Sequence, residues 1–240
     1  MFILVHGAYH GGWCWQPLIE RLQAHGHDTV APDLPGHAFA DGWIGQQNMS
    51  NYINAIVDTI DGMDTPPVLV GHSMSGAVVA AVAEHRPDKL EKVIFLAAYI
   101  PANGESVADV VRTDPQTHVT AGLVDVSGVT AISLKTGVLA DAFYNDATSK
   151  QIGWVQDRIQ LQAAEPFRTP ITISDENFGH VEKAAIVCRK DRAISCAHQR
   201  WMAERAGCHP VIELDTGHSP FVTAPELLAG ELMKLVGSTA

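Results

Sequence analysis

The 240-residue sequence lacks several features that would assign it to a particular class of protein. No apolar run approaches the roughly 20 residues needed to cross a bilayer. No cluster of lysine or arginine offsets the net charge of −11, so we expect neither membrane nor nucleic-acid binding. The four cysteines form no C-x-x-C pair and have no zinc-ligand spacing. The phosphate-binding motifs G-x-G-x-x-G and G-x-x-x-x-G-K-[ST] are also absent. We therefore expect no cofactor and no metal.

The remaining composition is typical of a globular protein. Hydrophobic residues make up 46% of the chain. A chain of this length can bury roughly 70–75% of its unfolded surface, which predicts a single domain over residues 1–240. The first residues, Met1 to Gly7, are predicted to form a core strand rather than a signal peptide, so we expect a cytoplasmic protein. The sequence leaves a homodimer open.

Short apolar runs alternate with amphipathic segments along most of the chain. This alternation predicts an α/β fold, with a mostly parallel sheet and helices on both of its faces. The predicted strands, with the two weaker ones last, are Phe2–Val5, Val68–Val70, Lys92–Ala97, Ala184–Cys188, Thr29–Ala31 and Val211–Leu214. The predicted helices are Gln16–His25, Met49–Met63, Ala77–His85, Ala197–Ala206 and Pro225–Val236.

Residues 100–180 interrupt this alternation with prolines, glycines and scattered aromatic residues. Only Lys150–Gln162 resembles a helix in this region. Because the strand pattern resumes at Ala184, we interpret the region as an insertion rather than a second domain. Ligands of open α/β sheets bind at the carboxyl ends of the strands. We therefore predict that the insertion forms a cap over a ligand site.

One motif carries most of the chemical information. Residues 67–76 read PVLVGHSMSG, in which an apolar strand pattern ends in Gly-x-Ser-x-Ser and a helix pattern follows. This arrangement is typical of a nucleophile elbow, a tight turn with small residues two positions before and after the serine. Gly71 and Ser75 meet this requirement, although glycine is commoner than serine at the second position. The motif predicts that Ser73 is a nucleophile.

A serine nucleophile needs a base, and the base needs a carboxylate to orient it. In folds with this elbow, the acid and then the histidine follow the serine along the chain. His218 lies in a loop after the last predicted strand and is the predicted base. Asp191 directly follows the strand pattern Ala184–Cys188 and is the predicted acid, although it could instead cap a helix. Asp175 and Asp215 are its rivals.

The oxyanion formed during acyl transfer needs two backbone N–H donors. The first predicted donor is the amide of Met74, directly after the nucleophile. The second is the amide of Ala8, in the glycine-rich loop Val5–Trp13. Metal binding by His6 and His10 is an alternative, but their spacing of four suits a helix rather than a loop. We instead expect His6 to hold the loop through hydrogen bonds.

With these residues in place, the sequence resembles the α/β-hydrolase superfamily along its whole length. Within it, the chain is similar to the plant methylesterase and hydroxynitrile lyase branch and its bacterial esterase relatives. The resemblance implies an α/β-hydrolase fold, a catalytic triad of Ser73, Asp191 and His218, and an oxyanion hole framed by Ala8 and Met74. The motifs that carry it are Val5–Trp15 (VHGAYHGGWCW), Ala31–Leu34 (APDL), Gly71–Ser73 (GHS), Ile186–Asp191 (IVCRKD), Gln199–Trp201 (QRW) and Thr216–His218 (TGH).

Together these features predict a cofactor-free serine hydrolase of the carboxylesterase type, acting on a small, partly apolar ester. The lyases of the branch that the chain resembles carry threonine at the position of Gly7 and lysine at the position of Ser219. Without that lysine, no fixed cation faces a departing cyanide, which favours hydrolysis. The alternatives are a hydroxynitrile lyase-type enzyme, a cofactor-free oxygenase that uses the His–Asp pair as a base, and a slow-turnover ligand-binding receptor.

Overall fold

A six-stranded parallel sheet forms the centre of the structure, in the order β2-β1-β3-β4-β8-β9. The computed structural model describes residues 1–38, 42–120, 123–126, 130–135 and 137–237. The domain predicted over 1–240 and the cap predicted over 100–180 therefore include residues outside these ranges. The strands of the sheet are β1 (Phe2–Val5), β2 (Thr29–Val30), β3 (Val68–His72), β4 (Lys92–Leu96), β8 (Lys183–Cys188) and β9 (Val211–Leu214).

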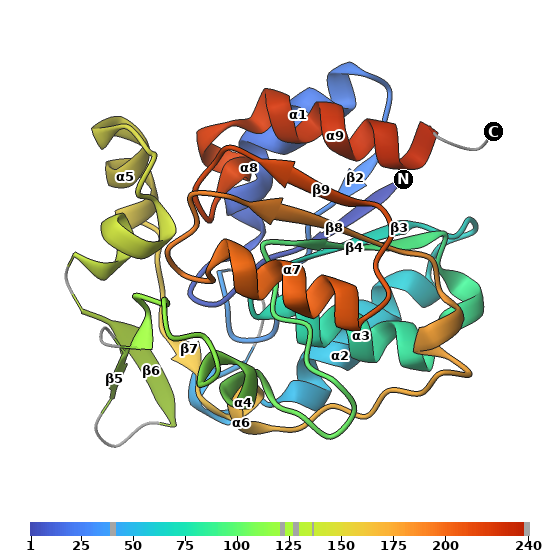
Figure 1. Ribbon diagram of the computed structural model, residues 1–240, viewed down its shortest axis with the longest axis horizontal. Coiled ribbons are helices and arrows are strands. Elements are labelled where there is room, and N and C mark those ends of the chain that lie inside the picture. The colour runs from blue at the N-terminus through green and yellow to red at the C-terminus, as the bar shows by residue number, and fades with distance from the viewer. Residues whose placement is uncertain (39–41, 121–122, 127–129, 136, 238–240) are drawn as a thin grey trace.

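Helices cover both faces of this sheet. Figure 1 shows α1 and α9 side by side above the sheet and α2, α3 and α7 below it. The predicted α/β fold, with a mostly parallel sheet between two layers of helices, is thus confirmed. The longer helices are α1 (Gln16–Ala24), α2 (Met49–Asp61), α3 (Ser75–His85), α7 (Cys196–Arg205) and α9 (Pro225–Gly237), and the short helix α8 (Pro220–Thr223) precedes α9.

The periodicity of the sequence explains why these segments fold as they do. Strands β1 and β3 are buried along their whole lengths, as expected for a parallel sheet that is covered on both faces. Asn48 caps the N-terminus of helix α2, and its side chain accepts a hydrogen bond from the Asn51 amide. The helix residues Tyr52, Ile56 and Ile60 recur every four positions and face the core. No helix among the described residues is long and apolar enough to span a bilayer.

The described residues between β4 and β8 add no strand to the central sheet. The segment contains a second, antiparallel sheet in the order β5-β6-β7, which was not predicted from the sequence. In Figure 1 this sheet and helix α5 lie on the side toward which the arrowheads of β8 and β9 point. The elements of the segment are α4 (Val107–Val111), β5 (Leu123–Asp125), β6 (Ala131–Leu134), the π-helix η5 (Leu139–Phe143), α5 (Ser149–Gln156), β7 (Gln162–Ala163) and α6 (Glu165–Arg168). Short 3-10 helices elsewhere are η1 (Gly12–Trp15), η2 (Ile44–Gln46), η3 (Pro87–Lys89) and η6 (Phe178–His180).

The helix predicted over Lys150–Gln162 is only half correct. Helix α5 starts at a capping box, in which the side chains of Thr148 and Gln151 each bond the backbone amide of the other residue, and it ends at Gln156. Gln162 instead lies in β7. Its side-chain oxygen contacts His37 Nε2 at 3.0 Å, and its amide nitrogen donates to the Tyr52 hydroxyl at 3.1 Å. These contacts with distant parts of the chain override the local helical preference.

Candidate active site

Ser73 lies in a sharp turn between β3 and α3. Its φ of 54° is in the left-handed region, which non-glycine residues seldom adopt and which is typical of strained turns at functional sites. Two backbone hydrogen bonds tie the turn to the end of β4 and to the residues that follow it. The Ser73 amide donates to the Leu96 carbonyl at 3.3 Å, and its carbonyl accepts from the Tyr99 amide at 3.0 Å. The backbone therefore has the geometry of the predicted elbow.

Small residues around Ser73 allow this turn to pack closely. A Cβ atom on Gly71 would lie 2.5 Å from Val79 Cγ2 and 2.8 Å from the Ser75 carbonyl oxygen. The side chain of Ser75, which departs from the commoner glycine, donates its hydroxyl to the His6 carbonyl. This hydrogen bond links the first turn of α3 to the loop that follows β1. The departure thus fits the elbow and fastens it to the neighbouring loop.

Gly76→Ala is expected to lower the free energy of unfolding by at least about 1–3 kcal/mol, because overpacking forces the backbone to shift. A Cβ at this position would lie 2.1 Å from the Tyr99 carbonyl oxygen. Gly230→Ala in α9 is the matched control, since a Cβ there would meet no described atom within 4 Å beyond the backbone of its own helix. The free energy of unfolding of that control should rise by roughly 0.5–1 kcal/mol, because alanine is favoured over glycine within a helix. Urea unfolding measures both, and a Gly76→Ala protein as stable as wild type would contradict this packing argument.

His218 and Asp191 form a buried pair after the ends of β9 and β8. His218 Nδ1 lies 2.7 Å from Asp191 Oδ2, and both side chains are completely buried. Because Nδ1 donates to the carboxylate, the neutral ring carries its lone pair on Nε2. That atom has no hydrogen-bond partner among the described residues. The ring thus has the tautomer and the free nitrogen that a general base requires.

The ring of His218 packs directly against the elbow. His72, the residue before Ser73, donates from Nε2 to the His218 carbonyl at 3.0 Å, and the two ring centroids are 4.5 Å apart. Burial lowers the pKa of His72 well below its usual value, so this ring stays neutral. The contact brings together the two loops that were predicted to carry the nucleophile and the base.

The carboxylate of Asp191 is held by further hydrogen bonds. Its Oδ1 accepts from the amides of Ala193 at 2.7 Å and Ile194 at 2.9 Å. Its Oδ2 accepts from Gln199 Nε2 at 2.7 Å as well as from His218. The amide contacts match the capping alternative, but the same side chain also bonds the histidine. A buried carboxylate needs such partners to offset the loss of water.

The rival carboxylates lie elsewhere. Asp215 is 55% exposed and forms ion pairs with Arg189 at 3.2 Å and Lys190 at 2.8 Å. Asp175 is exposed in the loop before η6. Among the described residues, Asp191 is therefore the carboxylate that contacts His218.

The two predicted oxyanion donors are the amides of Ala8 and Met74. Both residues are buried, and Ala8 lines the cavity in front of Ser73. Met74 lies at the N-terminus of α3, where the positive end of the helix dipole favours an anion. Neither amide donates a hydrogen bond to another described residue. Both amides therefore remain available to a substrate oxygen.

His6 holds the loop after β1, as the sequence predicted. Its Nδ1 donates to the Gly7 carbonyl at 2.8 Å, and its Nε2 accepts from the Leu34 amide at 3.0 Å. Both nitrogens of His10 are also within 2.7 Å of a partner, the Ala8 carbonyl and the Tyr144 hydroxyl. All four ring nitrogens thus take part in hydrogen bonds within the protein, which speaks against the metal alternative.

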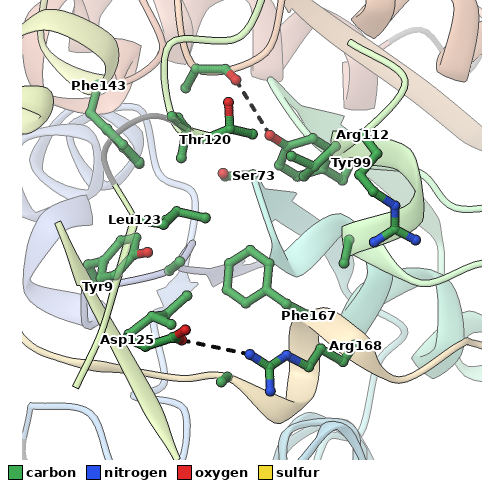
Figure 2. A pocket seen from close by; sticks show the side chains of 17 residues that line it. Tyr9, Ser73, Tyr99, Arg112, Thr120, Leu123, Asp125, Phe143, Phe167 and Arg168 are labelled. Atoms are coloured by element: carbon green, nitrogen blue, oxygen red, sulfur yellow. Dashed lines mark hydrogen bonds and ion pairs between the residues drawn. The ribbon is translucent and has the colours of Figure 1, made fainter. Parts of the chain in front are cut away.

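A cavity of about 300 Å³ opens in front of Ser73. Figure 2 shows Ser73 with Tyr9 and Tyr99 on opposite sides of the space and Phe167 across it. At the end away from Ser73, an ion pair of 3.7 Å joins Arg168 to Asp125. The lining residues are mostly apolar: Ala8, Tyr9, Ser73, Tyr99, Ala108, Val111, Arg112, Val119, Thr120, Leu123, Asp125, Ile132, Phe143, Ala164, Phe167, Arg168 and Ala193.

Most of this lining was not predicted from the sequence. The insertion is rich in aromatic residues, and two of them, Phe143 and Phe167, reach the cavity. Tyr9, which adopts a φ of 68°, was not predicted to line the site. The position of Tyr9 directly after the predicted oxyanion donor Ala8 could have indicated its role. Tyr99 follows β4 by three residues and could have been placed at the same edge of the sheet.

The chain is similar to several known hydrolases and esterases over nearly its whole length. The chain is 29% identical to the pyrethroid hydrolase of Sphingobium wenxiniae, over 95% of this chain and 84% of that protein. It is 28% identical to methylesterase 2 of Arabidopsis thaliana, over 98% of this chain and 95% of that protein. The crystal structure of a pyrethroid hydrolase from Sphingobium faniae matches with a TM-score of 0.87 at 26% identity, covering 99% of this chain and 97% of that one.

These relatives confirm the resemblance to the methylesterase branch and its bacterial relatives. Residues 2–231 match the profile described as the alpha/beta hydrolase family. That match includes the elbow, the loop after β1 and the loops that carry Asp191 and His218. Because it extends over nearly all of the sequence and agrees with the observed sheet, the chain belongs to the alpha/beta hydrolase family.

Proposed function

We propose that the protein is a cofactor-free serine carboxylesterase that works through an acyl-enzyme on Ser73. The observation that carries this proposal is the buried His218–Asp191 pair, in which the His218 ring packs against His72, directly before Ser73 at the edge of an apolar cavity. The relatives named as a pyrethroid hydrolase and a methylesterase support the same class of reaction.

Each group has a distinct role in the proposed reaction. Ser73 attacks the ester carbonyl while His218 Nε2 takes the hydroxyl proton and later returns it to the leaving alcohol. Asp191 holds the imidazole in its tautomer and stabilises the imidazolium that forms. The amides of Ala8 and Met74 bind the negative oxygen of the tetrahedral intermediate. Water activated by His218 then releases the acid and restores Ser73.

The cavity bounds the substrate. A volume of about 300 Å³ is at the lower end of small-molecule sites and suits a small ester. The aromatic side chains around Ser73 favour an apolar or aryl group next to the scissile bond. The charged pair Arg168–Asp125 at the far end confines the apolar part to the region near Ser73. We propose methyl or aryl esters as the substrate class.

Two positions favour hydrolysis over cyanohydrin cleavage. A Cβ on Gly7 would lie 2.9 Å from Ser73 Cβ and 2.8 Å from His72 Nδ1, so a threonine there would displace the nucleophile or its neighbour. Ser219 puts a neutral hydroxyl directly after His218, where an ammonium would be needed to stabilise departing cyanide. Both observations support ester hydrolysis.

The test is a substrate profile of the wild-type protein on p-nitrophenyl and methyl esters of increasing acyl size, with mandelonitrile as a separate arm. We expect hydrolysis of small esters, a decline once the acyl group exceeds the cavity, and cyanide release no faster than in buffer. A fluorophosphonate probe should label Ser73. Cyanide release that rivals ester hydrolysis, or no hydrolysis of any ester, would overturn the proposal.

We extend the proposal to the domain organisation, cellular location and partners of the enzyme. We propose one domain over residues 1–240 whose segment 100–180 caps the cavity, in a cytoplasmic protein whose partner is a small ester rather than nucleic acid or membrane. Whether the protein forms a homodimer is tested by measuring its mass in solution by light scattering across a range of concentrations.

A further inference from the structure

Three consecutive residues of the insertion, Tyr144, Asn145 and Asp146, contact three different loops of the proposed active site. We call residues 144–146 the cap tripeptide. They directly follow the π-helix η5. The side chain of Tyr144 is buried, with 1% exposure of the residue, whereas Asp146 lies at the surface. The mechanism proposed above assigns no role to any of them.

Tyr144 contacts the loop that carries the first proposed oxyanion donor. His10 Nδ1 donates to the Ala8 carbonyl at 2.7 Å. Burial lowers the pKa of His10 to about 4, so the ring is neutral near pH 7 and its Nε2 is an acceptor. The Tyr144 hydroxyl, 2.7 Å from Nε2, therefore donates to it. Through His10, Tyr144 fixes the backbone of Ala8.

Asn145 and Asp146 contact the residues that immediately precede the acid and the base. Asn145 Nδ2 donates to the Lys190 carbonyl at 3.0 Å, one residue before Asp191. Asp146 Oδ2 accepts from the Gly217 amide at 2.6 Å, one residue before His218. These contacts are independent of the direct His218–Asp191 hydrogen bond. They join both loops to one short segment of the insertion.

The fit at Gly217 is close enough to exclude a side chain. A Cβ on Gly217 would lie 2.5 Å from Asn145 Oδ1 and 2.6 Å from Asp146 Oδ1. The glycine that precedes His218 thus lets the tripeptide approach the backbone of the histidine loop. This steric fit is a second observation, besides the hydrogen bonds, that the segment and the loop are packed against each other.

We propose that the cap tripeptide is a positioning element that holds the oxyanion loop, the acid loop and the histidine loop in their mutual geometry. The proposal rests on the proposed function. A misplacement of about 1 Å can cost about 100-fold in rate, because the reacting groups must be aligned in the transition state. None of the three residues lines the walls of the cavity. Their hydrogen bonds therefore govern kcat rather than substrate affinity.

The test changes one residue of the cap tripeptide at a time, with Tyr144→Phe, Asn145→Ala and Asp146→Ala; the last also removes the acceptor of the Thr223 hydroxyl, 3.3 Å away. We expect each variant to lose about tenfold in kcat with KM changed less than about twofold. Asp146→Asn keeps an oxygen acceptor for the Gly217 amide and should retain most of the activity. Asp157→Ala, at an exposed carboxylate after α5, is the control and should match wild type. Unchanged kcat in all three variants would overturn the proposal.

A second measurement separates positioning from general damage. If Asp146 acts through the histidine loop, Asp146→Ala should cost much less in an Asp191→Asn background, because residues that act as a unit are non-additive. Equal losses in both backgrounds would indicate a merely structural role and refute positioning. If Asp146→Ala does not fold, Tyr144→Phe, which removes one oxygen atom, carries the kinetic test alone.

A spectroscopic signature distinguishes failure of this proposal from failure of the proposed function. The proton between His218 Nδ1 and Asp191 should give a downfield NMR resonance that does not depend on any substrate. We expect Asp146→Ala to shift or broaden it and Asp157→Ala to leave it in place. An unmoved resonance refutes the positioning role even if the ester substrates prove wrong. Absent Ser73-dependent hydrolysis in the wild type would instead refute the proposed function.

Discussion

Ser73→Ala is expected to lower kcat for ester hydrolysis by at least about 10³-fold, because only the oxyanion donors and substrate binding then remain. The fold should survive. The substitution removes one oxygen at the edge of a cavity and leaves the glycines that permit the elbow, Gly71 and Gly76, untouched. Hydrolysis of a p-nitrophenyl ester measures the loss, and thermal unfolding checks the fold.

Ser75→Ala is the matched control for this experiment. It removes a hydroxyl two residues away, whose hydrogen bond to the His6 carbonyl supports the loop after β1. A hydrogen bond of this kind contributes about 1 kcal/mol to stability, so the control should stay active and label with a fluorophosphonate. Ser73→Ala should do neither. Hydrolysis by Ser73→Ala within about tenfold of wild type would refute the nucleophile assignment.

The second large effect is expected at the carboxylate. Asp191→Asn should reduce kcat by up to about 10⁴-fold, because an amide in place of the carboxylate favours the wrong tautomer of the histidine. The Asp191 carboxylate lies 2.7 Å from His218 Nδ1 and is completely buried, so solvent cannot replace it. Separate measurements of kcat and KM distinguish this loss from a change in substrate binding.

Asp215→Asn serves as the comparison, since it changes the same functional group three residues from His218. Its carboxylate is 55% exposed and pairs with Arg189 and Lys190 at the surface, where an ion pair contributes about 0–1 kcal/mol. This variant should retain nearly all activity. A larger loss at Asp215 than at Asp191 would reassign the acid.

The parts of the fold that could be predicted are those whose signal is local. Strand Phe2–Val5 was predicted to the residue, since strands covered on both faces form apolar runs with clear ends. The edge strand Val211–Leu214, which is only partly buried, was also predicted to the residue. The elbow could be found because the tight turn around Ser73 demands small neighbours in a fixed pattern. The assignment of Asp191 followed from its place after a strand, and the structure adds its contact with His218.

The parts that could not be predicted depend on contacts between distant residues. Leu123–Asp125 and Ala131–Leu134 pair as antiparallel strands, but neither forms a long apolar run. Gln162 belongs to a strand because its side chain meets His37 and Tyr52, which lie more than a hundred residues away in the sequence. The role of residues 144–146 could not be predicted either, because it also depends on contacts with distant residues. A Tyr-Asn-Asp segment has no motif, and its partners become visible only when three loops are brought together in space.

The hydrogen bonds of residues 144–146 limit which parts of the cap insertion can be replaced, whether by engineering or in evolution. In folds of this kind the cap can in principle be exchanged as a module, since the loops of the central sheet carry the catalytic residues and the insertion shapes the substrate cavity. Here a cap transplanted over residues 100–180 would also remove the partners of His10, Lys190 and Gly217. A chimera that retains residues 144–146 keeps those partners while replacing the cavity walls contributed by α4 and α6. Substrate range can therefore change in this chain by substitution on either side of that segment more readily than by exchange of the whole insertion.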